Sequence, residues 1–150
     1  MRSSPALSTY STGAPLLVVF EQPGCDSCER FHETVLGDIA IRRLIREYEA
    51  VQLDASDTKL RLITPQGKTV TPARWFERLE LTYSPAIVFF DESCEEVMRL
   101  DSETRRLRME GSLQLVLDQL QSLKKQFQII FMVFSRCILQ QYSYLSRLRP

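Results

Sequence analysis

The 150-residue sequence has no excess of charge of either sign, and it contains few cysteines. Lysine plus arginine and aspartate plus glutamate both number 19, so the formal net charge is zero. No nucleic acid partner is therefore expected, and an anionic membrane is not expected as a general partner, because both attract basic surfaces. Four cysteines are too few for a disulfide-stapled scaffold. With 44% hydrophobic and 25% charged residues, the chain is expected to form one globular domain with a real core.

The sequence also lacks long hydrophobic segments. Residues 1–15 contain one arginine and no apolar stretch of the length that a secretory signal peptide needs. Residues 1–14 are instead predicted to form a flexible arm. The C-terminal segment, 127–150, contains six consecutive apolar residues, Ile129 to Phe134, where a membrane-spanning helix needs about twenty. We interpret it as a helical tail that packs on the domain or mediates self-association, with contact at a membrane surface as the alternative.

One stretch joins an apolar strand to two closely spaced cysteines. Residues 16–20 (LLVVF) predict a buried strand, and Pro23 with Gly24 ends it. Cys25 and Cys28 follow where a helical pattern begins. Free N–H groups and a partial positive charge at a helix N-terminus favour thiolate over thiol. Since the two cysteines are about one turn apart, we interpret Cys25 as the attacking thiol and Cys28 as the resolving thiol.

Two other roles are compatible with cysteines at this spacing. Half of a zinc site can have the same motif, but such sites add a second cysteine pair or a histidine pair at short spacing. The remaining candidate ligands, His32, Cys94 and Cys137, are scattered. We therefore expect redox chemistry without a metal or other cofactor, and inert thiols remain the third possibility.

The rest of the chain alternates between helical and strand patterns. Helices are predicted after Cys25, over 39–48, over 71–81 and from 111 onward; strands are predicted over 51–54, 85–90 and 96–101, with a small hairpin at 63–70. Thr71 and Pro72 form a typical helix start. The sole tryptophan, Trp75, shares its helical segment with Phe76 and Leu79, so it is interpreted as a core residue.

Taken together, these segments resemble the thioredoxin superfamily. The similarity lies in FEQPGCDSCERFHETVL, VQLDAS, TPQGKTVTP and LTYSPAIVFFDE, and it covers roughly residues 15–120. Within the superfamily, the chain is similar to the thioredoxin-like proteins linked to bacterial sulfur oxidation, the SoxW type. The resemblance implies an α/β thioredoxin fold over residues 15–126. This fold has a central mixed sheet flanked by helices, with the CxxC motif at the N-terminus of the first helix.

The resemblance also implies a site larger than the two cysteines. Pro85 is expected to be a cis proline beside the CxxC motif, and the backbone of Ser84 is expected to face an extended substrate strand. Pro23 and Gly24 are expected to contact the substrate as well. The implied partners are a disulfide-containing protein substrate and a reducing partner. The implied compartment is the periplasm, with the cytoplasm as the alternative.

The sequence departs from the family pattern at several positions. Val19 stands six residues before Cys25, where many relatives have a buried acid, and Glu21 is expected to point into solvent or toward the loop. Gly24 replaces a common tryptophan. His32 is expected to be partly exposed and without a role, rather than to tune the thiols.

Further along the chain, Cys94 is expected to be an exposed thiol in a turn. Cys137 lies in an apolar run and is expected to be buried or in a contact.

These features predict a thiol–disulfide oxidoreductase that works as a reductant or as a mild isomerase. The helix N-terminus favours a reactive Cys25, whereas the adjacent Asp26 opposes thiolate formation through its like charge. No basic residue lies between the cysteines, so an extremely acidic thiol is not expected. The alternative function is a non-catalytic thioredoxin-fold module that binds a partner or senses redox state.

Overall fold

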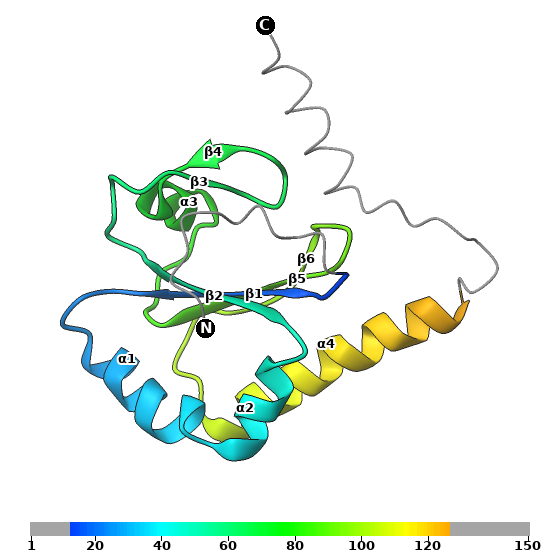
Figure 1. Cartoon of the computed structure of the whole chain (residues 1–150). Coiled ribbons are helices and arrows are strands. Elements are labelled where there is room, and N and C mark those ends of the chain that lie inside the picture. Colours follow the sequence, from blue (N-terminus) through cyan, green and yellow to red (C-terminus); the bar gives the residue numbers. More distant parts are fainter. Residues whose placement is uncertain (1–12, 127–150) are drawn as a thin grey trace, which may run out of the picture.

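The structure, a computed structural model, describes residues 13–126 and contains the elements of a mixed α/β domain (Figure 1). Almost all of the predicted arm and the whole predicted tail, including Cys137, lie outside the described residues. The elements are β1 (Leu16–Glu21), α1 (Asp26–Phe31), the π-helical turn η2 (His32–Leu36), α2 (Ile39–Ile45), β2 (Glu49–Asp54), β3 (Leu62–Ile63), β4 (Thr69–Val70), α3 (Pro72–Arg78), β5 (Ala86–Phe90), β6 (Glu96–Leu100) and α4 (Arg106–Gln126).

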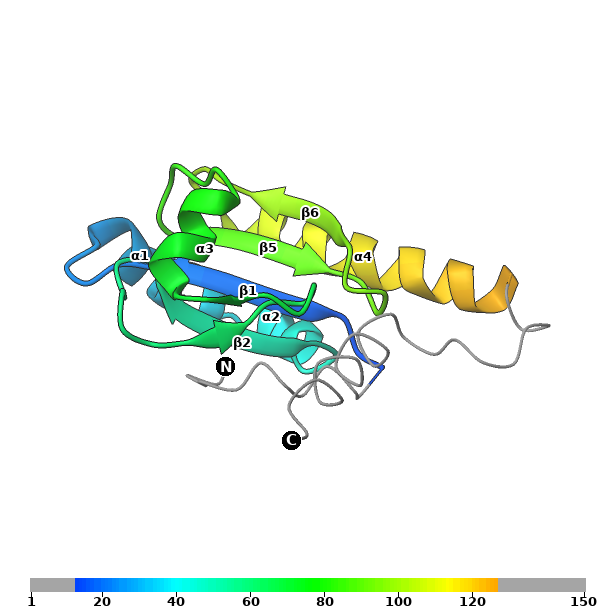
Figure 2. The same ribbon diagram turned by 90° about the horizontal axis from the view of Figure 1, so that it is seen from above.

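Four strands form the central sheet in the order β2-β1-β5-β6. β2 is parallel to β1, whereas β5 is antiparallel to both β1 and β6. Figures 1 and 2 show α1, α2 and α4 on one face of the sheet, and α3 with the β3–β4 hairpin on the other. All six residues of β1 are buried, because this central strand is covered on both faces. The architecture confirms the predicted fold class.

The alternation of side chains along β1 divides the core into two clusters. Leu16, Val18 and Phe20 point toward α3, where they pack with Trp75 and other apolar residues. Leu17 and Val19 point toward the opposite layer of helices. Trp75 is buried and stacks on Phe90 with ring centroids 5.9 Å apart, which confirms its interpretation as a core residue.

The boundaries of several elements differ from the prediction. The predicted helices 39–48 and 71–81 end earlier, at Ile45 and Arg78. α4 begins at Arg106 rather than at Gly111, because its buried apolar face starts with Met109, one turn before Leu113. Gly111 is therefore inside the helix, since tertiary packing overrides its weak helix propensity. β2 begins at Glu49, two residues before the predicted start, as its register with β1 extends to Leu16. None of the helices within residues 13–126 has the length and hydrophobicity that a bilayer crossing requires.

Candidate active site

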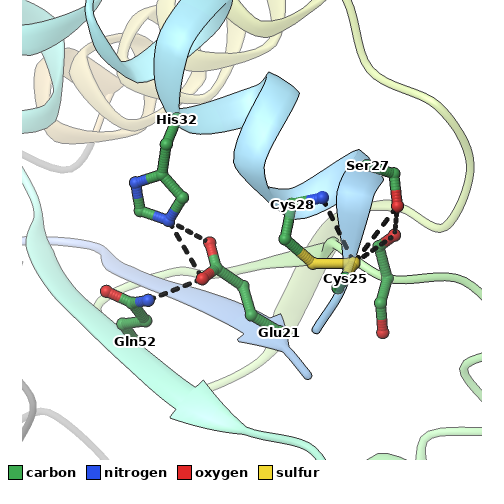
Figure 3. Close-up of a disulfide and its surroundings, with 7 residues drawn as sticks. Glu21, Cys25, Ser27, Cys28, His32 and Gln52 are labelled. Atoms are coloured by element: carbon green, nitrogen blue, oxygen red, sulfur yellow. Dashed lines mark hydrogen bonds and ion pairs between the residues drawn. A yellow bond between two sulfur atoms is a disulfide. The ribbon is translucent and has the colours of Figure 1, made fainter. Parts of the chain in front are cut away.

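The centre of the candidate site is a disulfide between Cys25 and Cys28, at the junction of β1 and α1 (Figure 3). Their Cα atoms are 5.2 Å apart. Cys25 is the N-cap of α1, and its Sγ accepts a hydrogen bond from the backbone N–H of Cys28 at 3.2 Å. Cys28 is only 4% exposed, whereas Cys25 is half-buried. Cys25 is thus the more accessible sulfur, and it lies where the helix N-terminus favours negative charge.

The turn before Cys25 depends on a glycine. Gly24 has a φ of +67°, a left-handed conformation that a larger side chain adopts only with strain. Pro23 and Gly24 are both exposed beside the disulfide. Pro23, however, borders a hollow of about 380 Å³ with Gln52 and Asp54, on the β2 side of the site. The structure therefore does not bring Pro23 into the same hollow as Pro85.

The segment that leads into β5 lies directly against the first cysteine. The Ser84 carbonyl oxygen is 3.6 Å from the Sγ of Cys25, and the Ser84–Pro85 peptide bond is cis. The carboxylate of Asp101 holds this segment by accepting hydrogen bonds from the backbone N–H groups of Thr82 and Tyr83, at 2.8–3.0 Å. The position of the Ser84 backbone beside Cys25 is thus fixed from the end of β6.

A third feature is a serine between the two cysteines, which sequence reasoning missed. The hydroxyl of Ser27 donates to the Ser84 carbonyl at 2.6 Å, and its Oγ lies 3.2 Å from the Sγ of Cys25. The signal in the sequence is a hydroxyl two residues after the N-cap cysteine, within the first turn of α1. Its meaning becomes clear only once the fold brings Ser84 to it, 57 residues further along the chain.

Glu21 is buried, so the expectation that it points into solvent or the loop is wrong. The residue is 9% exposed, and its carboxylate lies 2.7 and 2.9 Å from the Nε2 of His32. Gln52 donates a further hydrogen bond to it at 2.6 Å. Figure 3 shows Glu21 pointing from β1 toward both partners, on the side of the sheet where Cys28 lies. Strand periodicity could have revealed this, because Leu17, Val19 and Glu21 share one face.

His32 is partly exposed as expected, with 42% of its side chain accessible, yet it is not isolated. It begins η2, and its Nε2 is the hydrogen-bond partner of the buried Glu21 carboxylate. No group of three or more potential metal ligands occurs within the part of the chain that the structure describes.

Cys94 is not the exposed thiol that the sequence predicted. It is 3% exposed and disulfide-bonded, and its φ of +65° places it in the left-handed region within the β5–β6 turn. Its carbonyl oxygen accepts a hydrogen bond from the Gln66 side chain at 2.7 Å. The β3–β4 hairpin thus contacts this turn, a tertiary contact that a turn pattern alone does not indicate.

An open hollow of about 340 Å³ lies beside Ser27, the residue between the two cysteines, although neither cysteine lines it. Ser27 and Pro85 line it on the side of the cysteines, and Tyr83 forms part of the wall. Arg30 and Arg105, two exposed cations, also line it. The hollow therefore borders the residues next to Cys25 and Ser84, on the α1 side of the Ser84–Pro85 segment.

The family model for the Thioredoxin-like domain matches residues 8–117. The chain belongs to this family. The match includes every element from β1 to β6, the CxxC motif and the Ser84–Pro85 segment. The findings identify no finer subgroup of thioredoxin-like proteins, so the similarity to the SoxW type stays a prediction. No functionally curated protein gives a significant match to the sequence.

Solved structures with the same fold accompany the family match. A thioredoxin-fold protein from Helicobacter pylori is 18% identical with a TM-score of 0.63, covering 91% of this chain and 87% of that protein. A thioredoxin from Thermus thermophilus is 22% identical with a TM-score of 0.57, over 74% of this chain and 79% of that protein. The C-terminal domain of DsbD from Neisseria meningitidis, in its oxidised form, is 13% identical with a TM-score of 0.52, and the match covers 68% of this chain and 79% of that domain. At these identities the similarity establishes the fold of the thioredoxin-like domain.

Proposed function

We propose that this thioredoxin-like protein is a thiol–disulfide oxidoreductase that reduces disulfides in protein substrates. The observation that supports this most strongly is the unequal exposure of two cysteines at disulfide distance, with the accessible one at a helix N-terminus. A substrate reaches Cys25, while Cys28 stays shielded until the second step. A CxxC pair in a thioredoxin-like domain supports exchange chemistry in general, and the direction of electron flow is part of the proposal.

The reaction proceeds in two exchanges. The Cys25 thiolate attacks one sulfur of the substrate disulfide, forming a mixed disulfide and releasing the other substrate sulfur as a thiolate. Cys28 then loses its proton and attacks the Sγ of Cys25, which releases the second substrate thiolate. Two electrons pass to the substrate and the Cys25–Cys28 disulfide forms. A dithiol reducing partner restores the starting state by the same exchange in reverse.

The surroundings of Cys25 supply the proposed substrate contacts. Ser84 offers its backbone beside the attacking sulfur, and Pro85 lines the adjoining hollow. Pro23 and Gly24 form the exposed turn on the other side of the disulfide. We propose that an extended substrate segment crosses these residues, with its disulfide above Cys25.

The proposed compartment rests on the sequence resemblance, and the proposed assembly rests on the apolar residues of the C-terminal segment. We propose a periplasmic protein, with the cytoplasm as the alternative, because its resemblance is to SoxW-type proteins. Residues 127–150 are proposed to mediate self-association or contact at a membrane surface. Fractionation of cells that express the full chain, with analytical ultracentrifugation of the purified protein, tests both points.

Turnover of insulin disulfides with dithiothreitol as the electron donor tests the proposed reaction. The wild-type protein is expected to accelerate reduction, and Cys25→Ser is expected to abolish the acceleration. Cys28→Ser is expected to accumulate a mixed disulfide through Cys25, because no resolving thiol remains. Equal activity in wild type and Cys25→Ser would contradict the proposal. An inactive wild type that still binds partner proteins would favour the non-catalytic or redox-sensing module.

A further inference from the structure

The hydroxyl of Ser27 lies between two acceptors that take part in different steps of the proposed reaction. Its Oγ is 2.6 Å from the carbonyl oxygen of Ser84 and 3.2 Å from the Sγ of Cys25. Figure 3 shows the Ser27 side chain beside Cys25. Ser27 is only half-buried at the start of α1, so its hydroxyl has room to reorient. A serine hydroxyl has a single proton to donate, and it can therefore serve only one of these acceptors at a time.

The better acceptor depends on the oxidation state of Cys25. In the disulfide, the sulfur is neutral and a weak acceptor, so the carbonyl oxygen at the shorter distance receives the proton. Reduction of the disulfide frees the Cys25 sulfur, which can then ionise to the thiolate that attacks the substrate. A hydrogen bond to an ionised acceptor is roughly twice as strong as one between neutral groups. The preference of the hydroxyl is thus expected to reverse.

We propose that Ser27 is a positioning residue. When the disulfide is reduced, its hydroxyl exchanges the hydrogen bond to the Ser84 carbonyl for one to the Cys25 thiolate and keeps its proton. This inference rests on the proposed function. In the reduced protein, the hydrogen bond stabilises the nucleophile and leaves both lone pairs of the Ser84 carbonyl to an N–H of the substrate segment. In the oxidised protein, Ser27 again donates to one lone pair of that carbonyl, so it competes with the substrate N–H and weakens the hold on the reduced product. The residue therefore links the redox state of Cys25 to substrate binding.

Other charged or titratable groups surround the site and are independent of Ser27. They are Asp26 on α1, Glu21 on β1 with its partner His32, and the residues Arg30, Glu103, Arg105 and Arg106 that line the hollow beside Ser27. Substitution of Ser27 leaves each of these charged side chains in the protein. A difference between Ser27 variants therefore reports on the hydroxyl.

The first test is the pH profile of Cys25 alkylation by iodoacetamide in the reduced protein, quantified at Cys25 by mass spectrometry. In Ser27→Ala the midpoint is expected to move upward by about one pH unit, because the thiolate loses a charge-assisted hydrogen bond. Ser27→Thr keeps a hydroxyl and is expected to match the wild type. Ser56→Ala removes another hydroxyl, one that donates to Asp54, and serves as the matched control. An unchanged midpoint in Ser27→Ala would overturn the proposal.

The second test follows the Ser84 carbonyl by its ¹³C resonance in the oxidised and reduced protein. In the wild type the resonance is expected to move on reduction, as the carbonyl loses its donor. In Ser27→Ala the oxidised protein is expected to show the value of the reduced wild type already. Equal resonances in oxidised wild type and oxidised Ser27→Ala would overturn the proposal. Both tests work without a substrate, so inactivity toward insulin would refute the proposed function separately from the role of Ser27.

Discussion

At the scale of single residues, polar groups around the disulfide are paired more closely than the sequence suggests. The Glu21 carboxylate accepts from Gln52 and pairs with His32 beneath α1, although the preceding residues of β1 are all apolar. A buried carboxylate requires such partners, because an unpaired charge in the interior is costly. His32 and Gln52 therefore form part of the structural support of the site.

Replacing Glu21 with alanine is expected to lower the free energy of unfolding by about 2 kcal/mol, since two donors lose a charged acceptor. Urea denaturation of the oxidised proteins measures this change. The matched control is Glu29→Ala on the exposed surface of α1, where the expected change is below about 0.5 kcal/mol. Equal effects of the two substitutions would contradict the assigned role of Glu21.

At the scale of elements, Asp38 connects the layer of helices that covers one face of the sheet. Its carboxylate caps α2 by accepting from the backbone N–H groups of Ala40 and Ile41, and it pairs with Arg106 at the start of α4. The hydrogen bond from Arg106, followed by those from the backbone, holds the pKa of Asp38 below its ordinary value. The ionised form is therefore the one that stabilises the fold.

The contribution of Asp38 is expected to depend on pH. A carboxyl whose pKa is lowered by folding stabilises the native state fully above its unfolded pKa, and this stabilisation is lost as the pH falls through the folded pKa. Asp38→Asn retains a capping oxygen but loses the charge. The urea midpoint of this variant is expected to lie below that of the wild type at pH 7. The difference between the two midpoints should become smaller as the pH falls below 3.8, the ordinary pKa of the carboxyl group. A gap that is constant between pH 7 and pH 3 would contradict this account.

Parts of the elements and of the site could be predicted from the sequence. The apolar run of β1, the cysteine pair and the proline-led β5 have strong local signals, and the structure has all of them in the predicted order. The burial of Glu21 is not predicted, because a charged residue at the end of a strand is expected to reach solvent or the loop, whereas the period of two along β1 places it on the inward face. Cys94 and Ser27 were missed for a different reason, since the residues that pack on or bond to them are distant in sequence. Local patterns do not reveal such contacts.

At the scale of the whole molecule, the fold does not depend on the candidate active-site disulfide. Both clusters of the core are built on the central sheet, and the disulfide closes a loop with a sequence separation of only 3. For so short a loop, the loss of chain entropy in the unfolded state contributes about 2 kcal/mol to the free energy of unfolding. The pair is thus free to be oxidised and reduced while the domain stays folded.

The double variant Cys25→Ser with Cys28→Ser is accordingly expected to remain folded. Its free energy of unfolding should fall by no more than about 2 kcal/mol relative to the oxidised wild type. Far-ultraviolet circular dichroism and urea denaturation measure the two quantities. An unfolded double variant would show that the disulfide is structural, which would argue against a redox role.

The reduction potential of the Cys25–Cys28 pair tests the central claim most directly. The protein is equilibrated with defined ratios of reduced to oxidised dithiothreitol, and the oxidised fraction of this pair is measured by mass spectrometry. A reductant is expected to titrate as a two-electron couple near about −270 mV. A value of about −120 to −180 mV would contradict the proposed direction of electron flow. A pair that stays reduced at every ratio would contradict disulfide exchange itself.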